Sequence, residues 1–190
     1  MTNTVKLPDP IPMVTPLTEA LGKRRSRRDF SSKPIEPALL STLLWSAAGL
    51  TSPTGLRTVP SAMDSREIVV FVFDQKGVWL YDAQNASLLQ TAEGDKRSET
   101  TLGQIFVAKA PVTLVFAADT TRCQKLNGPL FDRCLCVDAG CVTMAGQLAA
   151  TALGLASVPR ASFDDERVRT LLAQDGRFTP IMALTVGYPA

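Results

Sequence analysis

The stretch Cys134–Leu155, CLCVDAGCVTMAGQLAATALGL, decides the fold class of this chain. Nearly all of its residues are small or aliphatic, and no charged residue lies between Asp138 and Arg160. A helix that is apolar all round is a buried one, so we predict a long buried helix over about residues 130–154. A monomer of 190 residues has little protein with which to surround such a helix. We therefore expect it to be buried at the two-fold interface of a homodimer.

The segments around this helix predict a mixture of helices and strands without strict alternation. We expect helices at about 17–24, 37–48, 99–110 and 164–174, a β-hairpin at 67–82, and strands at 111–119, 156–159 and 179–189. This order indicates an α+β fold in which helices flank a central, mostly antiparallel sheet. Residues 1–16 are rich in proline and predict an extended N-terminal arm, and residues 17–190 predict a single domain.

Composition excludes several classes of function. The formal net charge is only +2, whereas a protein that binds nucleic acid usually has a large basic excess, so we expect no nucleic-acid partner. The chain has no histidine, which removes Ser-His-Asp and Cys-His catalysis and the commonest metal ligand. No apolar run reaches the length of a membrane span, and the N-terminus does not resemble a signal peptide. We expect a cytoplasmic protein, while an exported form whose signal has been removed stays open.

The four cysteines do not predict a metal site. They are Cys123, Cys134, Cys136 and Cys141, and their spacing differs from the paired C-x2-C of zinc ribbons. Three of them belong to the predicted long helix, where cysteine behaves as a small apolar residue. We interpret them as core residues.

The basic cluster Lys23–Arg28, KRRSRR, places five cations in six positions. Such a run can be a solvated surface, a nucleic-acid or localisation signal, or a clamp for one anion. If the chain leaves the helix here, Arg24, Ser26 and Arg28 alternate onto one side, which suits a single phosphate because arginine binds phosphate bidentately. The sequence contains no glycine-rich phosphate loop, so side chains would hold a phosphorylated cofactor.

Four motifs, in order along the chain, resemble those of one family. They are RRSRRDF (24–30), RTVPSAMDSREIVVFV (57–72), DAGCVTMAGQLAATALGLASVPRASFD (138–164) and LTVGYPA (184–190). Together they are similar to the signatures of the FMN-dependent nitroreductase family. The segments LLSTLLWSAAGL (39–50) and RTVPSA resemble more specifically the branch that contains SagB-type dehydrogenases.

The resemblance implies a nitroreductase-like homodimer that binds FMN at the subunit interface. By motif position, the residues that contact the FMN phosphate, ribityl chain and pyrimidine edge are Arg24, Arg25, Ser26 and Arg28. Those that approach the same flavin from the partner subunit are Pro60, Ser61, Ala62 and Met63. Those that line one face of the ring are Val158, Pro159, Arg160 and Ala161. The further implied contacts are Gln104 and, at the phosphate, Arg177.

The activity that the resemblance implies is an oxidoreductase. NAD(P)H would give a hydride to flavin N5, and a nitroaromatic, quinone or similar acceptor would then take it in a ping-pong order. No catalytic side chain is implied, although Arg25 or Arg28 would stabilise the reduced flavin. A SagB-type dehydrogenase or oxidase of a peptide heterocycle and a flavin-binding protein without turnover are the alternatives. Met63 and Met144-Ala145 stand where the family often has polar residues, which bears on the choice of substrate.

Overall fold

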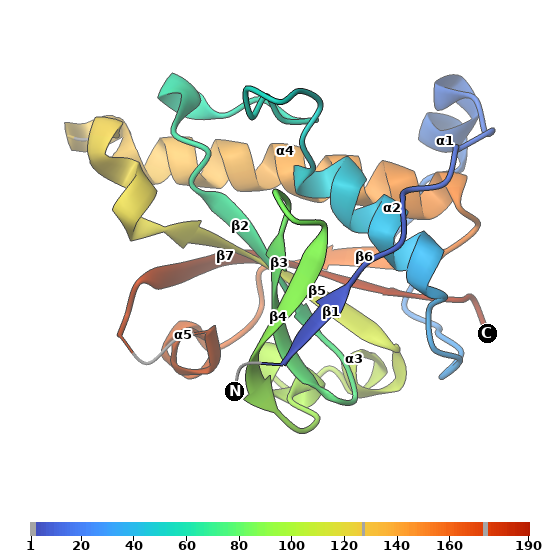
Figure 1. Cartoon of the computed structure of the whole chain (residues 1–190). Helices are drawn as coiled ribbons and strands as arrows, with labels where there is room; N and C mark the ends of the chain where they lie inside the picture. The colour runs from blue at the N-terminus through green and yellow to red at the C-terminus, as the bar shows by residue number, and fades with distance from the viewer. Residues whose placement is uncertain (1–2, 127, 173–174) are drawn as a thin grey trace.

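The structure, a computed structural model, describes residues 3–126, 128–172 and 175–190. Its centre is a seven-stranded sheet in the order β1-β4-β3-β2-β5-β7-β6 (Figure 1). The strands are β1 (Thr4–Lys6), β2 (Ile68–Phe73), β3 (Gly77–Asp82), β4 (Ser87–Glu93), β5 (Val112–Asp119), β6 (Ala156–Arg160) and β7 (Phe178–Gly187). All neighbouring strands pair antiparallel. The sheet is therefore antiparallel, as predicted for an α+β fold.

The helices lie on both faces of this sheet. They are α1 (Leu17–Lys23), α2 (Pro37–Ala48), α3 (Ile105–Lys109), α4 (Phe131–Ala152) and α5 (Asp165–Leu172), with 3-10 turns η1 (Ala62–Asp64), η2 (Arg97–Thr100), η3 (Thr120–Lys125) and η4 (Gly128–Leu130). Helices α2 and α4 cross one face of the sheet, and α5 covers the other (Figure 1).

Strand β2 shows why both faces must be covered. All of its residues are buried, and successive side chains of a strand point to opposite faces. Val70 therefore packs in the core beneath α2 and α4, whereas Phe71 packs in the core with Leu172 of α5. A continuous run of β-branched and aromatic residues in the sequence is thus a strand at the centre of three layers.

The long helix α4 is buried on one side and open on the other in the single chain. Its buried residues include Leu135, Val142 and Ala150, which pack in the core shared with α2. Val137 and Met144 lie on the opposite side and are 57% and 47% exposed. Although α4 is long and apolar enough to cross a membrane, half of it is buried in the protein's own core, as in the core helix of a globular protein. The apolar face of α4 that carries Val137 and Met144 is therefore exposed in the single chain.

The structure differs from the sequence-based expectations in three places. Strand β4, which is half polar and follows the predicted hairpin, was not predicted. The N-terminal arm was not predicted to pair with the sheet, but its strand β1 pairs with β4 at the edge. The single helix predicted at 99–110 is instead the short turn η2 followed by the five-residue helix α3. Gly103, with a φ of +87°, breaks the helix between them because this backbone conformation is not helical.

Candidate functional site

The basic cluster leaves helix α1 and runs beside strand β6. Arg24 is the C-cap residue of α1, and Ser26 then forms an isolated parallel bridge with Ser157 of β6. The N–H of Arg27 donates to the carbonyl oxygen of Ser157 over 2.9 Å. The chain after Arg24 is therefore extended, which is the condition under which alternate side chains of the cluster share a side.

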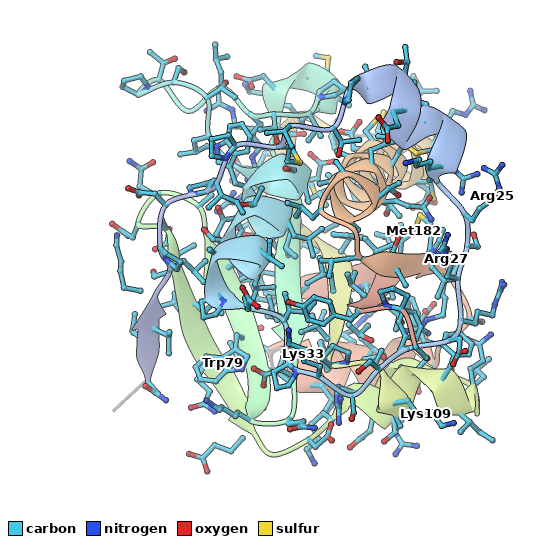
Figure 2. The ribbon with its side chains drawn as sticks, turned by 90° about the vertical axis from the view of Figure 1, so that its right-hand side faces the viewer. Arg25, Arg27, Lys33, Trp79, Lys109 and Met182 are labelled. Atoms are coloured by element: carbon cyan, nitrogen blue, oxygen red, sulfur yellow. The ribbon has the colours of Figure 1, made fainter. Side chains whose placement is uncertain are left out.

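This extended run separates the cations of the cluster into two groups. Arg25 and Arg27 line one small cavity together with Lys23, and the Arg25 guanidinium donates to two backbone carbonyls of its own segment. Figure 2 labels both arginines along the stretch that follows α1. Arg28 is exposed, and among the described residues its side chain has no hydrogen bond or ion pair. Arg28 is thus available to a ligand, whereas Arg25 has partners on the other side of the run.

Arg24 connects the cluster to the C-terminal half of α4. Its Nη1 donates to Oε1 of Gln147 over 3.4 Å. Gln147 is buried, and its Nε2 has no hydrogen-bond partner among the described residues. A buried amide donor without a partner is costly, so this corner has the capacity to hold a further acceptor.

Strand β6 supplies the wall next to the cluster. Val158 is buried and Pro159 is half-buried, while Ala161 is exposed just beyond the end of the strand. Gln104 lies nearby, because its Oε1 accepts a hydrogen bond from the hydroxyl of Ser162. The structure thus places the predicted residues of β6 beside the run with Ser26, and Gln104 just beyond the end of that strand.

The side chain of Arg160 has a structural role instead. Its guanidinium donates to the carbonyl and hydroxyl of Thr100 and to the hydroxyl of Thr185, and no carboxylate faces it among the described residues. Burial lowers the pKa of Arg160 to about 10. Because this guanidinium is satisfied inside the protein, only the backbone of Arg160 is available to a ligand.

The loop with Pro60, Ser61, Ala62 and Met63 lies at the other end of α4. The N–H of Ala62 donates to Oδ2 of Asp138 over 2.6 Å. Met63 is 68% exposed and has a φ of +54°, a strained conformation for a residue with a side chain. The bond to Asp138 therefore holds this strained loop against α4 and leaves the Met63 side chain free.

Two buried carboxyl groups anchor this loop. Glu67 is fully buried, and its Oε2 accepts hydrogen bonds from the hydroxyls of Ser61 and Ser65. Burial, and then the neighbouring Glu67 carboxyl, raise the pKa of Asp138, although the Ala62 N–H acts in the opposite direction. Asp138 therefore retains its proton to a higher pH than a solvent-exposed aspartate does.

The two predicted groups of cofactor-binding residues do not meet within one chain. Asp138, which holds the loop, and Gln147, which contacts Arg24, are nine residues apart on α4, or about 14 Å along its axis. Arg177 lies farther still. It pairs with Asp119 at the start of β7, whereas Ser157 pairs with Val186 at the other end of that strand, about 30 Å away.

Sequence reasoning missed the three polar residues that position these groups. They are Glu67, Asp138 and Gln147. The signal for the last two was present, because a carboxylate and an amide in an otherwise apolar helix are expected to have specific partners. The residues next to Glu67 in the sequence gave no indication that its side chain is buried.

Comparison with known proteins gives one consistent result. Residues 21–188 match the Nitroreductase family. A protein of Methanocaldococcus jannaschii that is assigned to the nitroreductases is 33% identical over 180 residues, which cover 90% of each chain.

Solved structures agree. One from Ralstonia eutropha, also assigned to the nitroreductases, has a TM-score of 0.91 and 32% identity over 98% of this chain and 90% of its own. One from Desulfovibrio desulfuricans, in complex with FMN, has a TM-score of 0.65 and 19% identity over 93% and 87%.

The carboxyl pair predicts a specific dependence of stability on pH. Asp138→Asn keeps an oxygen for the Ala62 N–H but cannot ionise. Because the pKa of Asp138 is raised by folding, the folded protein retains a proton that the unfolded chain loses above a pH of about 4, and this contribution to stability falls as the pH rises. The free energy of unfolding of Asp138→Asn, relative to the wild type, should therefore increase from about pH 4 to about pH 7 in urea titrations. A relative value that is constant or falls with pH would contradict the assignment.

Proposed function

The chain belongs to the nitroreductase family and is an oxidoreductase, and we propose that it works with bound FMN. Bound FMN would supply the redox chemistry, taking a hydride from NAD(P)H and passing it to a nitroaromatic, quinone or similar acceptor in a ping-pong order. The residues of the chain would bind and orient this cofactor and exclude water. The absence of histidine from the chain is consistent with a reaction whose chemistry is supplied by the cofactor rather than by a side chain.

The observation that carries the proposal is the extended run of the basic cluster beside β6. Ser26 and Arg28 are exposed on this run, and Arg24 donates to Gln147, whose Nε2 has no partner among the described residues. A guanidinium can bind phosphate through two parallel N–H donors, and the hydroxyl of Ser26 can add a further hydrogen bond. The amide of Gln147 can donate to an oxygen or nitrogen of a ligand. These groups fit a phosphorylated, polar-edged cofactor such as FMN.

We further propose that the functional unit is a homodimer. The run beside β6 and the loop Pro60–Met63 lie at opposite ends of α4, so one chain offers each half of the site but not the two together. Two α4 helices packed antiparallel about a two-fold axis would place the loop of one chain next to the basic run of the other. The apolar open face with Val137 and Met144 is suited to that contact, because it would be buried in the dimer.

Backbone geometry supports the role of the loop in this arrangement. Met63, Asp64 and Arg66 all have φ values above +50°. Strain of this kind persists only where the surrounding contacts impose it, and it often marks ligand-binding segments. The contacts from Asp138 and Glu67 impose it here. They would fix the position at which the loop meets the flavin of the partner.

Anaerobic reduction of the purified protein tests the proposed activity. We expect an oxidised-flavin absorbance spectrum that NADH or NADPH bleaches rapidly and a nitroaromatic or quinone then restores. Bleaching only by an organic donor would favour the SagB-type dehydrogenase, and no bleaching would favour a flavin-binding protein without turnover. A colourless protein that does not take up added FMN would contradict the flavin assignment itself.

Neighbouring arginines on opposite sides of the run give a matched test of cofactor binding. Arg28→Ala should weaken FMN binding about tenfold to a hundredfold, because it removes charge-assisted hydrogen bonds to the cofactor. Arg27→Ala removes the same charge one position away, from a side chain that lines the separate cavity with Arg25, and should change FMN affinity by less than about threefold. Fluorescence titration of the two apoproteins measures both constants. Equal losses would show a general charge effect rather than a specific site.

A further inference from the structure

A cavity of about 380 Å³ lies where β2 begins and β3 ends, beneath the loop that follows α2. Of the residues predicted to bind the cofactor, Arg177 alone lines it. Its volume is within the range of small-molecule sites. The cavity is therefore a candidate site separate from the proposed flavin site.

Four arginines from four separate segments converge on this cavity. They are Arg57, Arg66, Arg122 and Arg177. Arg66 forms a bidentate pair with Asp64 at 2.7 and 2.8 Å. Asp119 is shared by Arg122 at 3.2 Å and Arg177 at 2.6 Å. One carboxylate thus serves two guanidinium groups, and part of their positive charge is left without compensation.

Arg57 has no carboxylate partner within 4.0 Å among the residues that the structure describes. Its Nη1 donates to the carbonyl oxygen of Ile68 over 2.6 Å, while its Nε is buried without a partner. Burial, followed by the nearby Arg122, lowers the pKa of Arg57 to about 10, although the Glu67 carboxyl acts in the opposite direction. A partly buried guanidinium with an unused donor and a cationic neighbour is stabilised by an anion.

The acidic residues at and near the cavity have contacts of their own. Asp82 accepts hydrogen bonds from the backbone N–H groups of Gln84 and Asn85 in its own turn. Glu67 accepts from two serine hydroxyls through Oε2, while its Oε1 has no partner among the described residues. Asp119 is held by its two arginines. Among the described residues, none of these carboxylates forms an ion pair with Arg57.

Besides the arginines, Asp82, Gln84 and Asp119, the lining is mainly apolar and aromatic. It includes Leu50, Val69, Leu80, Tyr81, Leu89 and Phe178. A site that combines guanidinium donors with such walls favours a ligand with a charged group at one end and a hydrocarbon body at the other. An inorganic ion alone would leave the apolar walls without a contact.

We propose that this cavity binds a small organic anion, with a carboxylate or phosphate group on Arg57 and Arg122 and a compact apolar body against Leu80 and Phe178. Both head groups offer the planar or tetrahedral oxygens that arginine binds bidentately. Binding at this site does not require the proposed flavin activity, because Arg177 alone of the predicted cofactor residues lines the cavity, although Arg57 and Arg66 also border the loop with Pro60 and Ser61. Arg177, predicted from its motif position to contact the FMN phosphate, belongs to this second site.

Isothermal titration of the purified full-length protein with two probes tests the proposal, and FMN is kept saturating so that the flavin site is filled. The probes are benzoate and phenyl phosphate, and benzyl alcohol is the neutral control. We expect one of the anions to bind saturably below about 10 mM, whereas benzyl alcohol should not bind. Arg57→Gln should weaken binding at least about tenfold, since it removes the guanidinium closest to the anion. Arg169→Gln, which changes an exposed arginine of α5, should leave binding unchanged.

Arg57 also donates a hydrogen bond to the backbone of β2, so Arg57→Gln could weaken binding by disturbing the fold. A second variant keeps the proposal testable in that case. Arg122 is 43% exposed, so Arg122→Gln should fold normally and still weaken binding about threefold. Competition between the probes identifies the head group that the site prefers. The proposal is overturned if neither anion binds, if benzyl alcohol binds equally well, or if Arg169→Gln reduces affinity as much as the variants of the cavity.

Discussion

The packing of α4 across the sheet is the constraint on which the rest of this structure depends. One face of the helix completes the core with α2, and its few polar residues then fix the two segments that matter for function. Asp138 holds the strained loop at one end through the Ala62 N–H, and Gln147 meets Arg24 near the other. The length of the helix keeps these segments apart within one chain, which is why we propose that a second copy of the chain completes the site.

The arrangement also separates two kinds of arginine. On the run beside β6, Arg28 is exposed without a side-chain partner among the described residues and Arg24 contacts Gln147, as we expect of residues proposed to bind a phosphorylated cofactor. Arg160 and Arg97 are buried and tied to backbone carbonyls at Thr100 and Ala110, so they stabilise the connection between η2 and the sheet. A count of arginines would not distinguish these roles, because they follow from burial and from the available acceptors.

Much of the fold could be predicted from the sequence because its determinants are local. The apolar run of α4, the leucine spacing of α2 and the alternation after Arg24 all depend on residues a few positions apart. The residues next to Arg160 and Arg177 in the sequence do not indicate which groups the two guanidinium groups contact. Whether a guanidinium faces a ligand, a backbone carbonyl or Asp119 is decided by segments far away in the sequence. Strand β4, which is half polar and lies between β3 and the edge strand β1, gave too weak a local pattern to be predicted.

The central claim is that the flavin site is split between the two ends of α4 and is completed by a second chain. Val137→Glu tests it most directly, since it places a charge on the open apolar face of α4 at a residue that is not among those predicted to bind the cofactor. Sedimentation and flavin absorbance, measured together, should show a wild-type dimer with one FMN per chain and a folded, monomeric variant that has lost its flavin. A monomeric Val137→Glu protein that still holds FMN as tightly as the wild type would contradict the account.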